Sequence, residues 1–169
     1  AVAHGRELAE QGADILDIGG ESTRPGSDPV SEEEEIRRVV PVIKRLSREC
    51  TLPLSIDTYK ANVARAGLAA GACIVNDISG LTYDPSMIEV VREFQATVIL
   101  MHVLGSPKTM QVRPVYQDVV REVYEFLESR SAAARGVGIS QIIIDPGLGF
   151  GKDKQIIDHI KQVFARCNN

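Results

Sequence analysis

The sequence predicts an α/β protein built from βα units around a parallel sheet. Short apolar runs rich in β-branched residues alternate along the chain with amphipathic segments of helical spacing, which is the pattern of βα units. Each apolar run is almost continuously hydrophobic, as expected of strands that are covered on both faces. Five runs fit this description: Ile15 to Ile18, Leu54 to Ile56, Cys73 to Val75, Thr97 to Met101 and Ile142 to Ile144.

Start signals place helices between these runs. Residues 1 to 13 form the first predicted helix, ahead of the first strand. Ser31 and Glu34 have the spacing of a capping box, and apolar residues recur after them at helical spacing. Pro41 lies inside this second helix, so we expect a kink there.

The later helices follow similar signals. Asp84 and Pro85 predict an N-cap followed by proline at the first helical position. Another apolar stripe begins at Val119 and stops near Gly136, and a final helical pattern starts at Ile156. No strand pattern precedes the first helix or follows the last one. We therefore expect residues 1–169 to be one partial domain, cut at both ends.

Composition excludes several classes of protein. Hydrophobic residues make up 44% of the chain and charged residues 25%, which excludes disordered and fibrous classes. The net charge of −4, with basic and acidic residues interspersed, predicts no nucleic-acid partner. No apolar run approaches the roughly 18 residues needed to span a bilayer, so no membrane partner is expected either.

Cysteines and histidines predict a reducing compartment and no metal site made by protein ligands alone. The three cysteines, Cys50, Cys73 and Cys167, are widely spaced and form no Cys-x-x-Cys pair. The histidines never stand at the spacing that places two ligands on one helical face. We expect a cytoplasmic protein, or an organellar one if a transit peptide precedes this sequence.

Polar residues follow every predicted strand. In parallel βα architectures ligands bind beyond the carboxyl ends of the strands, where Asp57, Asn76 and Asp145 are expected to surround a single ligand. The competing interpretation is that such residues only cap the helices that follow. Asp17 and Asp77 are expected to orient loops, and His102 reads more simply as a hydrogen-bonded histidine at a strand end.

The run from Asp145 to Lys152 carries three glycines and one aromatic residue directly after a strand, which predicts a loop that approaches a flat ligand. It is no Walker A loop, because its glycines are too close together and Asp153 follows the lysine. Two carboxylates and an amide suit the N–H edge of a 2-amino-4-oxopyrimidine, as in a pterin or guanine. Lys152 itself is expected to pair with acidic residues of the following helix.

Taken together, several segments resemble the dihydropteroate synthase family of folate biosynthesis. The first and last are long and specific, and the others occur in the family's order. They are Asp17 to Gly26, Ser55 to Thr58, Asn76 to Ile78, Leu100 to His102 with Thr109 to Gln111, and Asp145 to Lys152. The resemblance implies a (βα)8 TIM barrel, of which this chain would supply strands two to six of eight.

By this resemblance the chain belongs to a transferase that condenses 6-hydroxymethyl-7,8-dihydropterin pyrophosphate with p-aminobenzoate, giving 7,8-dihydropteroate. The resemblance assigns two groups of residues and no catalytic residue. The first binds the pterin: Asp57, Asn76, Ile78, Met101, Asp145 and Phe150. The second belongs to a loop beside the p-aminobenzoate and pyrophosphate: Thr23, Arg24 and Pro25.

The family also implies Mg2+ as a cofactor and a homodimer for the complete enzyme, although the asparagine that helps bind Mg2+ is not in this sequence. The family's later lysine, serine and anion-site segments are also missing here, so we expect the chain to be inactive alone. Two alternatives stay open. One is a pterin-dependent methyltransferase, and the other is a non-catalytic pterin-binding or interaction product.

Overall fold

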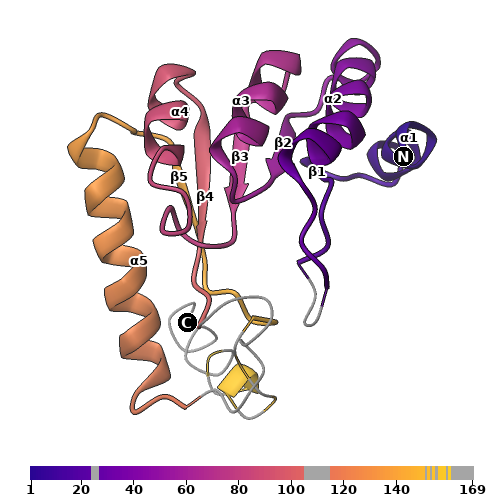
Figure 1. Cartoon of the computed structure of the whole chain (residues 1–169). Helices are drawn as coiled ribbons and strands as arrows, with labels where there is room; N and C mark the ends of the chain where they lie inside the picture. Colours follow the sequence, from indigo (N-terminus) through magenta and orange to yellow (C-terminus); the bar gives the residue numbers. More distant parts are fainter. Residues whose placement is uncertain are drawn as a thin grey trace.

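All five predicted strands form, and they pair into one parallel sheet (Figure 1). The computed structural model describes residues 1–23, 27–104, 115–150, 152, 154, 156–158 and 160. Within these residues the strand order is β1-β2-β3-β4-β5, the same as the order along the chain. The strands are β1 (Leu16–Gly19), β2 (Leu54–Asp57), β3 (Ile74–Asp77), β4 (Thr97–Met101) and β5 (Ile142–Asp145).

A helix precedes each strand, and the sequential strand order determines where the helices lie. The helices are α1 (Val2–Glu10), α2 (Glu32–Glu49), α3 (Ala61–Ala70), α4 (Met87–Glu93) and α5 (Val119–Gly136). Crossovers between parallel strands are right-handed, so a sheet whose order never reverses carries its helices on one face. This is the arrangement of consecutive units of a (βα)8 barrel, and it confirms the predicted fold class.

Helix α2 begins where the capping box was predicted, although only half of the box forms. The hydroxyl of Ser31 accepts a hydrogen bond from the Glu34 amide at 3.3 Å. The Glu34 side chain pairs with Arg37 and Arg38 at 2.7 Å to each, and these partners draw its carboxylate toward the exposed face of the helix. The helix continues through Pro41 to Glu49.

The predicted start of α4 at Asp84 and Pro85 was wrong by two residues, because α4 begins at Met87. Asp84 has other partners. Its carboxylate accepts hydrogen bonds from the Ser86 amide at 3.0 Å and from the Ala61 amide at 2.8 Å. Because Ala61 is the first residue of α3, Asp84 joins the starts of two neighbouring helices.

The two faces of the sheet bury different residues. Leu54, Ile56, Val75, Val98 and Leu100 face the helices and belong to the main hydrophobic cluster. On the opposite face, Ile74, Ile78 and Met101 are also buried but lie outside this cluster. This second face corresponds to the interior of a barrel, and it positions the candidate site.

Strand bounds differ from the prediction at the carboxyl ends. The polar residues expected to follow the apolar runs are themselves strand residues: Asp57, Asn76, Asp77 and Asp145 lie within or end their strands. Residues 156–158 and 160 are helical, in agreement with the last helical pattern. Among the residues described, none of the helices has the length and apolarity needed to cross a membrane.

We predict that truncating a residue on the helix-packed face of the sheet destabilises the protein more than truncating a residue on the open face. Ile56→Ala removes a side chain with 0% exposure and should lower the free energy of unfolding by about 2 to 5 kcal/mol. Ile143→Ala, on the other face with 42% exposure, should cost about 1 kcal/mol or less. Urea unfolding measures both, and equal losses would contradict the assignment of the faces.

Candidate functional site

The register of the sheet brings the predicted polar residues onto one face at one edge. Gly19 pairs with Asp57 and Asp57 pairs with Asn76, while Met101 pairs with Asp145 at the other side of the sheet. Paired residues in neighbouring strands project to the same face. Asp57, Asn76, Met101 and Asp145 therefore share the inner face near the carboxyl ends of their strands, as the sequence predicted.

Asp57 is the most perturbed acid of this group. Burial, together with the negative charges of Asp17, Glu35, Asp77 and Glu21, raises the pKa of its carboxyl to about 7. Its Oδ1 is buried and accepts no hydrogen bond from the described residues. A buried acceptor without a donor is costly, and the residue that carries it projects to the inner face of the sheet.

Asn76 is held in place by Asp17. The side-chain amide of Asn76 donates to the Asp17 carboxylate at 2.9 Å, and both residues lie on the inner face. Asp17 was expected to orient a loop, whereas it orients this amide instead. This bond uses one N–H of the amide and leaves the carbonyl oxygen and the second N–H of Asn76 for other partners.

Asp145 and the glycine loop after it are tightly connected to the end of β4. The Asp145 carboxylate accepts from the Gly147 amide at 2.7 Å, and the Asp145 carbonyl accepts from the His102 amide at 3.0 Å. Gly147 has a φ of +64°, and a Cβ there would lie 2.1 Å from the His102 carbonyl oxygen. Only glycine allows this approach.

The apolar candidates surround these polar groups. Met101 and Ile78 are buried on the inner face, and Phe150 is half-buried at the end of the glycine loop. The side chain of Met101 lies against Gly147, since a Cβ on that glycine would be 3.1 Å from the Met101 Cγ. These residues give the site an apolar wall beside its carboxylates, as a flat heterocycle requires.

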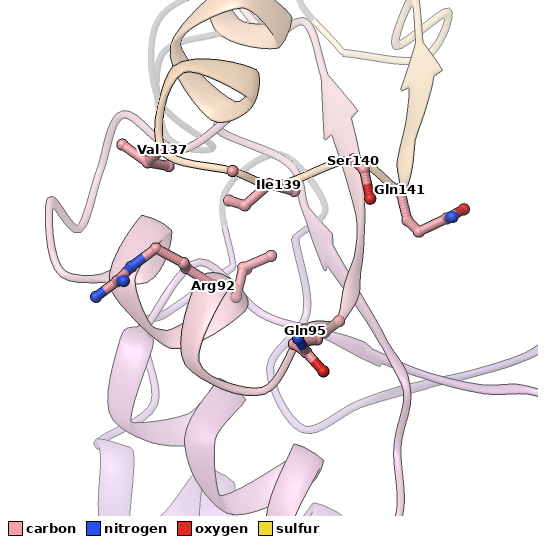
Figure 2. A pocket seen from close by; sticks show the side chains of 9 residues that line it. Arg92, Gln95, Val137, Ile139, Ser140 and Gln141 are labelled. Atoms are coloured by element: carbon pink, nitrogen blue, oxygen red, sulfur yellow. The ribbon is translucent and has the colours of Figure 1, made fainter.

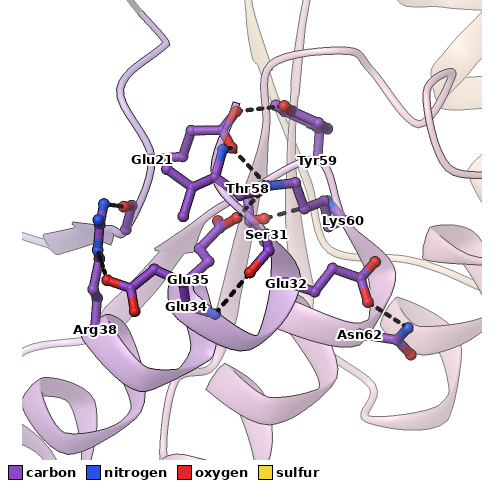
Figure 3. A network of polar contacts seen from close by, with 12 residues as sticks. Glu21, Ser31, Glu32, Glu34, Glu35, Arg38, Thr58, Tyr59, Lys60 and Asn62 are labelled. Atoms are coloured by element: carbon purple, nitrogen blue, oxygen red, sulfur yellow. Dashed lines mark hydrogen bonds and ion pairs between the residues drawn. The ribbon is translucent and has the colours of Figure 1, made fainter. Parts of the chain in front are cut away.

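The loop after β1 is anchored by an ion-pair network that sequence reasoning missed (Figure 3). Lys60, just before α3, contacts Glu21 at 2.6 Å and Glu35 at 2.7 Å, and it donates to the Val30 carbonyl at 2.6 Å. The Tyr59 hydroxyl donates to the same Glu21 carboxylate. The network ties the start and the end of the loop to α2 and α3.

The contacts of this network offset the cost of burying its charges. Burial alone would raise the pKa of Glu21, but hydrogen bonds from Lys60, Tyr59 and Val30 lower it overall. Burial would also lower the pKa of Lys60, which the two glutamates raise. The sequence does show polar residues after the first two strands, which was a signal for this network. Which of these residues contact one another depends on the tertiary structure.

Of the predicted loop residues, only Thr23 lies in the described part of the chain. It follows Glu21 by two residues and is half-buried beside the anchored segment. Arg24 and Pro25 lie outside the described residues.

Asp77 has a structural role, as predicted. It is buried, and it accepts from the Ser79 amide and hydroxyl at 2.8 and 2.7 Å and from the Leu81 amide at 3.1 Å. The prediction that Lys152 pairs with acids of the following helix was wrong for Asp158, the acid of that segment within the described residues. Among the described residues the contacts of Lys152 are to His102 and to loop carbonyls, and its side chain is buried.

A cavity of about 310 Å3 lies at the opposite, amino end of the sheet (Figure 2). It is formed between the segments that lead into β4 and β5, which carry Gln95, Ser140 and Gln141. None of the predicted site residues lines it, so it is separate from the site at the carboxyl edge. Among the residues described, no group of three or more His, Cys, Asp or Glu side chains forms a metal-binding cluster.

Comparison with known proteins gives one consistent result. The family model of pterin-binding enzymes matches residues 1–167. A dihydropteroate synthase from Synechocystis is 46% identical over 154 residues, which cover 90% of this chain and 53% of that protein. The chain therefore spans about half the length of this curated relative.

Solved structures show the same likeness. Xanthomonas albilineans dihydropteroate synthase with 4-aminobenzoic acid superposes with a TM-score of 0.90 at 48% identity, covering 98% of this chain and 59% of that one. The same enzyme in complex with 7,8-dihydropteroate gives a TM-score of 0.84 at 43% identity, covering 98% of this chain and 58% of that one.

We predict that the raised pKa of Asp57 depends partly on its acidic neighbour. Asp17→Asn removes a negative charge, so the Asp57 carboxyl should titrate below the value of about 7 found in the parent chain. Burial remains, so the pKa should stay above that of a free aspartate. Carboxyl-carbon NMR measures it, with Asp28→Asn as a distant control. An unchanged titration in Asp17→Asn would exclude the coupling.

Proposed function

Because the chain belongs to the pterin-binding enzyme family, we propose that it carries the pterin-binding part of a dihydropteroate synthase. The observation that carries this proposal is the shared inner face of Asp57, Asn76 and Asp145, with a buried acceptor of Asp57 left without a donor. The relative solved with 7,8-dihydropteroate supports the same choice of ligand.

The polar groups match the edge of a pterin. A carboxylate accepts two parallel N–H bonds from a 2-amino-4-oxopyrimidine, and these charge-assisted bonds are stronger than neutral ones. Asp57 is the acceptor that most needs such donors, because its buried Oδ1 accepts from none of the described residues. Asn76, held by Asp17, offers both a donor and an acceptor to the remainder of the edge.

The apolar residues would contact the faces of the ring. Met101 and Ile78 are buried on the inner face, and Phe150, half-buried at the end of the glycine loop, is proposed to cover the ring. A methionine side chain adapts to a flat partner and makes favourable contacts with aromatic rings. Together these residues would hold the pterin with its methylene directed out of the site.

In the proposed reaction the amine of p-aminobenzoate forms a C–N bond to the pterin methylene. The bond from that carbon to the pyrophosphate oxygen breaks, and the amine loses a proton. Thr23, Arg24 and Pro25 are proposed to lie beside the p-aminobenzoate and pyrophosphate. The anchored base of their loop, held by Lys60, supports this for Thr23. No residue of the chain is assigned to the proton transfer.

Mg2+ stays a proposed cofactor that would neutralise the leaving pyrophosphate. The described residues offer it no cluster of ligands, so no step is assigned to it here. A cytoplasmic location and a homodimer are proposed for the complete protein, on the basis of the family.

The experiment that tests this function measures which ligand binds and whether product forms. Calorimetry with 6-hydroxymethyl-7,8-dihydropterin pyrophosphate should detect binding to the 169-residue chain, and the complete protein should form dihydropteroate when p-aminobenzoate is added. A preference for methyltetrahydrofolate would favour a methyltransferase instead. No affinity for any pterin would overturn the proposal.

We predict that Asp145→Asn weakens pterin binding by roughly 1.5 to 3 kcal/mol, the cost of a lost hydrogen bond to a charged group. The loop should survive, because an amide oxygen can still accept from Gly147. Calorimetry measures the affinity, and Asp158→Asn, on the helical segment after the loop, is the control. Unchanged affinity in Asp145→Asn would show that the carboxylate does not contact the pterin.

A further inference from the structure

Lys152 is buried at the centre of the glycine loop. Its side chain is 2% exposed, and its ammonium group lies 3.0 Å from the carbonyl oxygens of Gly147 and Phe150. It also lies 3.0 Å from the Nδ1 atom of His102 and 3.4 Å from the His102 carbonyl oxygen. The ammonium group of Lys152 therefore connects three parts of the site: Gly147 in the first turn of the loop, Phe150 near its end, and His102 at the end of β4.

His102 serves this contact as an uncharged acceptor. Burial and, to a smaller extent, the positive charge of Lys152 lower its pKa to about 4. Because Nδ1 faces the ammonium, the ring proton of the neutral imidazole is on Nε2. The ring packs edge-on against Phe126, with 5.1 Å between the centroids. The imidazole is thus held by its neighbours and presents a fixed lone pair.

Gly147 transmits the position of Lys152 to Asp145. The Gly147 carbonyl accepts from Lys152 and from the Phe150 amide, while the Gly147 amide donates to the Asp145 carboxylate at 2.7 Å. The same glycine has a positive φ and lies against the His102 backbone, so its own backbone has little freedom to rotate. The carbonyl and the amide of Gly147 lie in adjacent peptide planes that meet at its Cα. If Lys152 released the carbonyl, the backbone could rotate about this Cα, and the amide that holds the Asp145 side chain would be less firmly placed.

We propose that Lys152 is a positioning residue that sets the orientation of Asp145 and Phe150 in the site. The inference rests on the proposed pterin function, since these two residues are assigned to that ligand. Lysine suits the role because it has donors only, and all four groups around it are acceptors. A methionine fills similar space but donates nothing.

The test compares Lys152→Met with Lys154→Met, which alters an exposed lysine two residues further on. Lys152→Met should weaken binding of 6-hydroxymethyl-7,8-dihydropterin pyrophosphate roughly 10- to 100-fold, the scale of one hydrogen bond to a charged group. Lys154→Met should leave the affinity unchanged. Retention of full affinity by Lys152→Met would overturn the proposal.

A second readout follows the loop without any ligand. The amide proton of Gly147 is hydrogen-bonded to Asp145, so its NMR shift should move toward that of a solvated amide in Lys152→Met. It should stay in place in Lys154→Met. The two proposals can therefore fail separately. If the parent chain binds no pterin, the proposed function is wrong. If the Gly147 signal does not move in Lys152→Met, the positioning role is wrong.

A third measurement tests the proposal even if Lys152→Met does not fold. Lys152→Ala leaves the four acceptors around an open space, and added n-propylammonium should restore the Gly147 signal and the pterin affinity. Propanol, which lacks the charge and two of the donors, should restore neither. Equal recovery with both additives would indicate that Lys152 only fills space.

Discussion

The parallel, in-register pairing of five consecutive strands is the constraint on which the rest of this structure depends. Because neighbouring strands run in the same direction, their carboxyl ends meet at one edge, and paired residues share a face. Asp57, Asn76 and Asp145 are separated along the sequence, yet the register places them on one face, with Asp57 paired to Asn76. A slip by one residue in any strand would turn its polar residue toward the apolar helices.

The same edge gathers many carboxylates, and the fold separates them by their partners. Glu21 and Glu35 share the ammonium of Lys60, and Asp77 accepts from two amides and a hydroxyl. Asp57 keeps a buried oxygen without a donor, and its pKa rises to about 7. Acids that shape the fold are thus satisfied within it, while the least satisfied one faces the proposed ligand.

Local sequence patterns predicted the strands because each strand carries a short run of apolar residues, and they placed the polar residues at the correct edge. The expectation that every run is covered on both faces was wrong for β5, where Ile143 and Ile144 are exposed. The same patterns gave wrong predictions where a side chain contacts a residue that is distant in the sequence. Asp84 joins two helices instead of starting one, and Lys152 contacts His102, fifty residues earlier, instead of a nearby acid. Such choices depend on which groups are buried together, and a one-dimensional pattern does not contain that information. Arg24 and Pro25 lie outside the described residues, so their predicted role stays a prediction.

A crystal structure of the chain soaked with 6-hydroxymethylpterin would locate the ligand directly. We expect the ring on the inner face of the sheet, with its N–H edge on Asp57 and Asp145, its remaining polar edge on Asn76, and Met101 against its face. A pterin bound instead in the cavity beside Gln95 and Ser140, with the carboxyl edge left without ligand, would contradict this expectation.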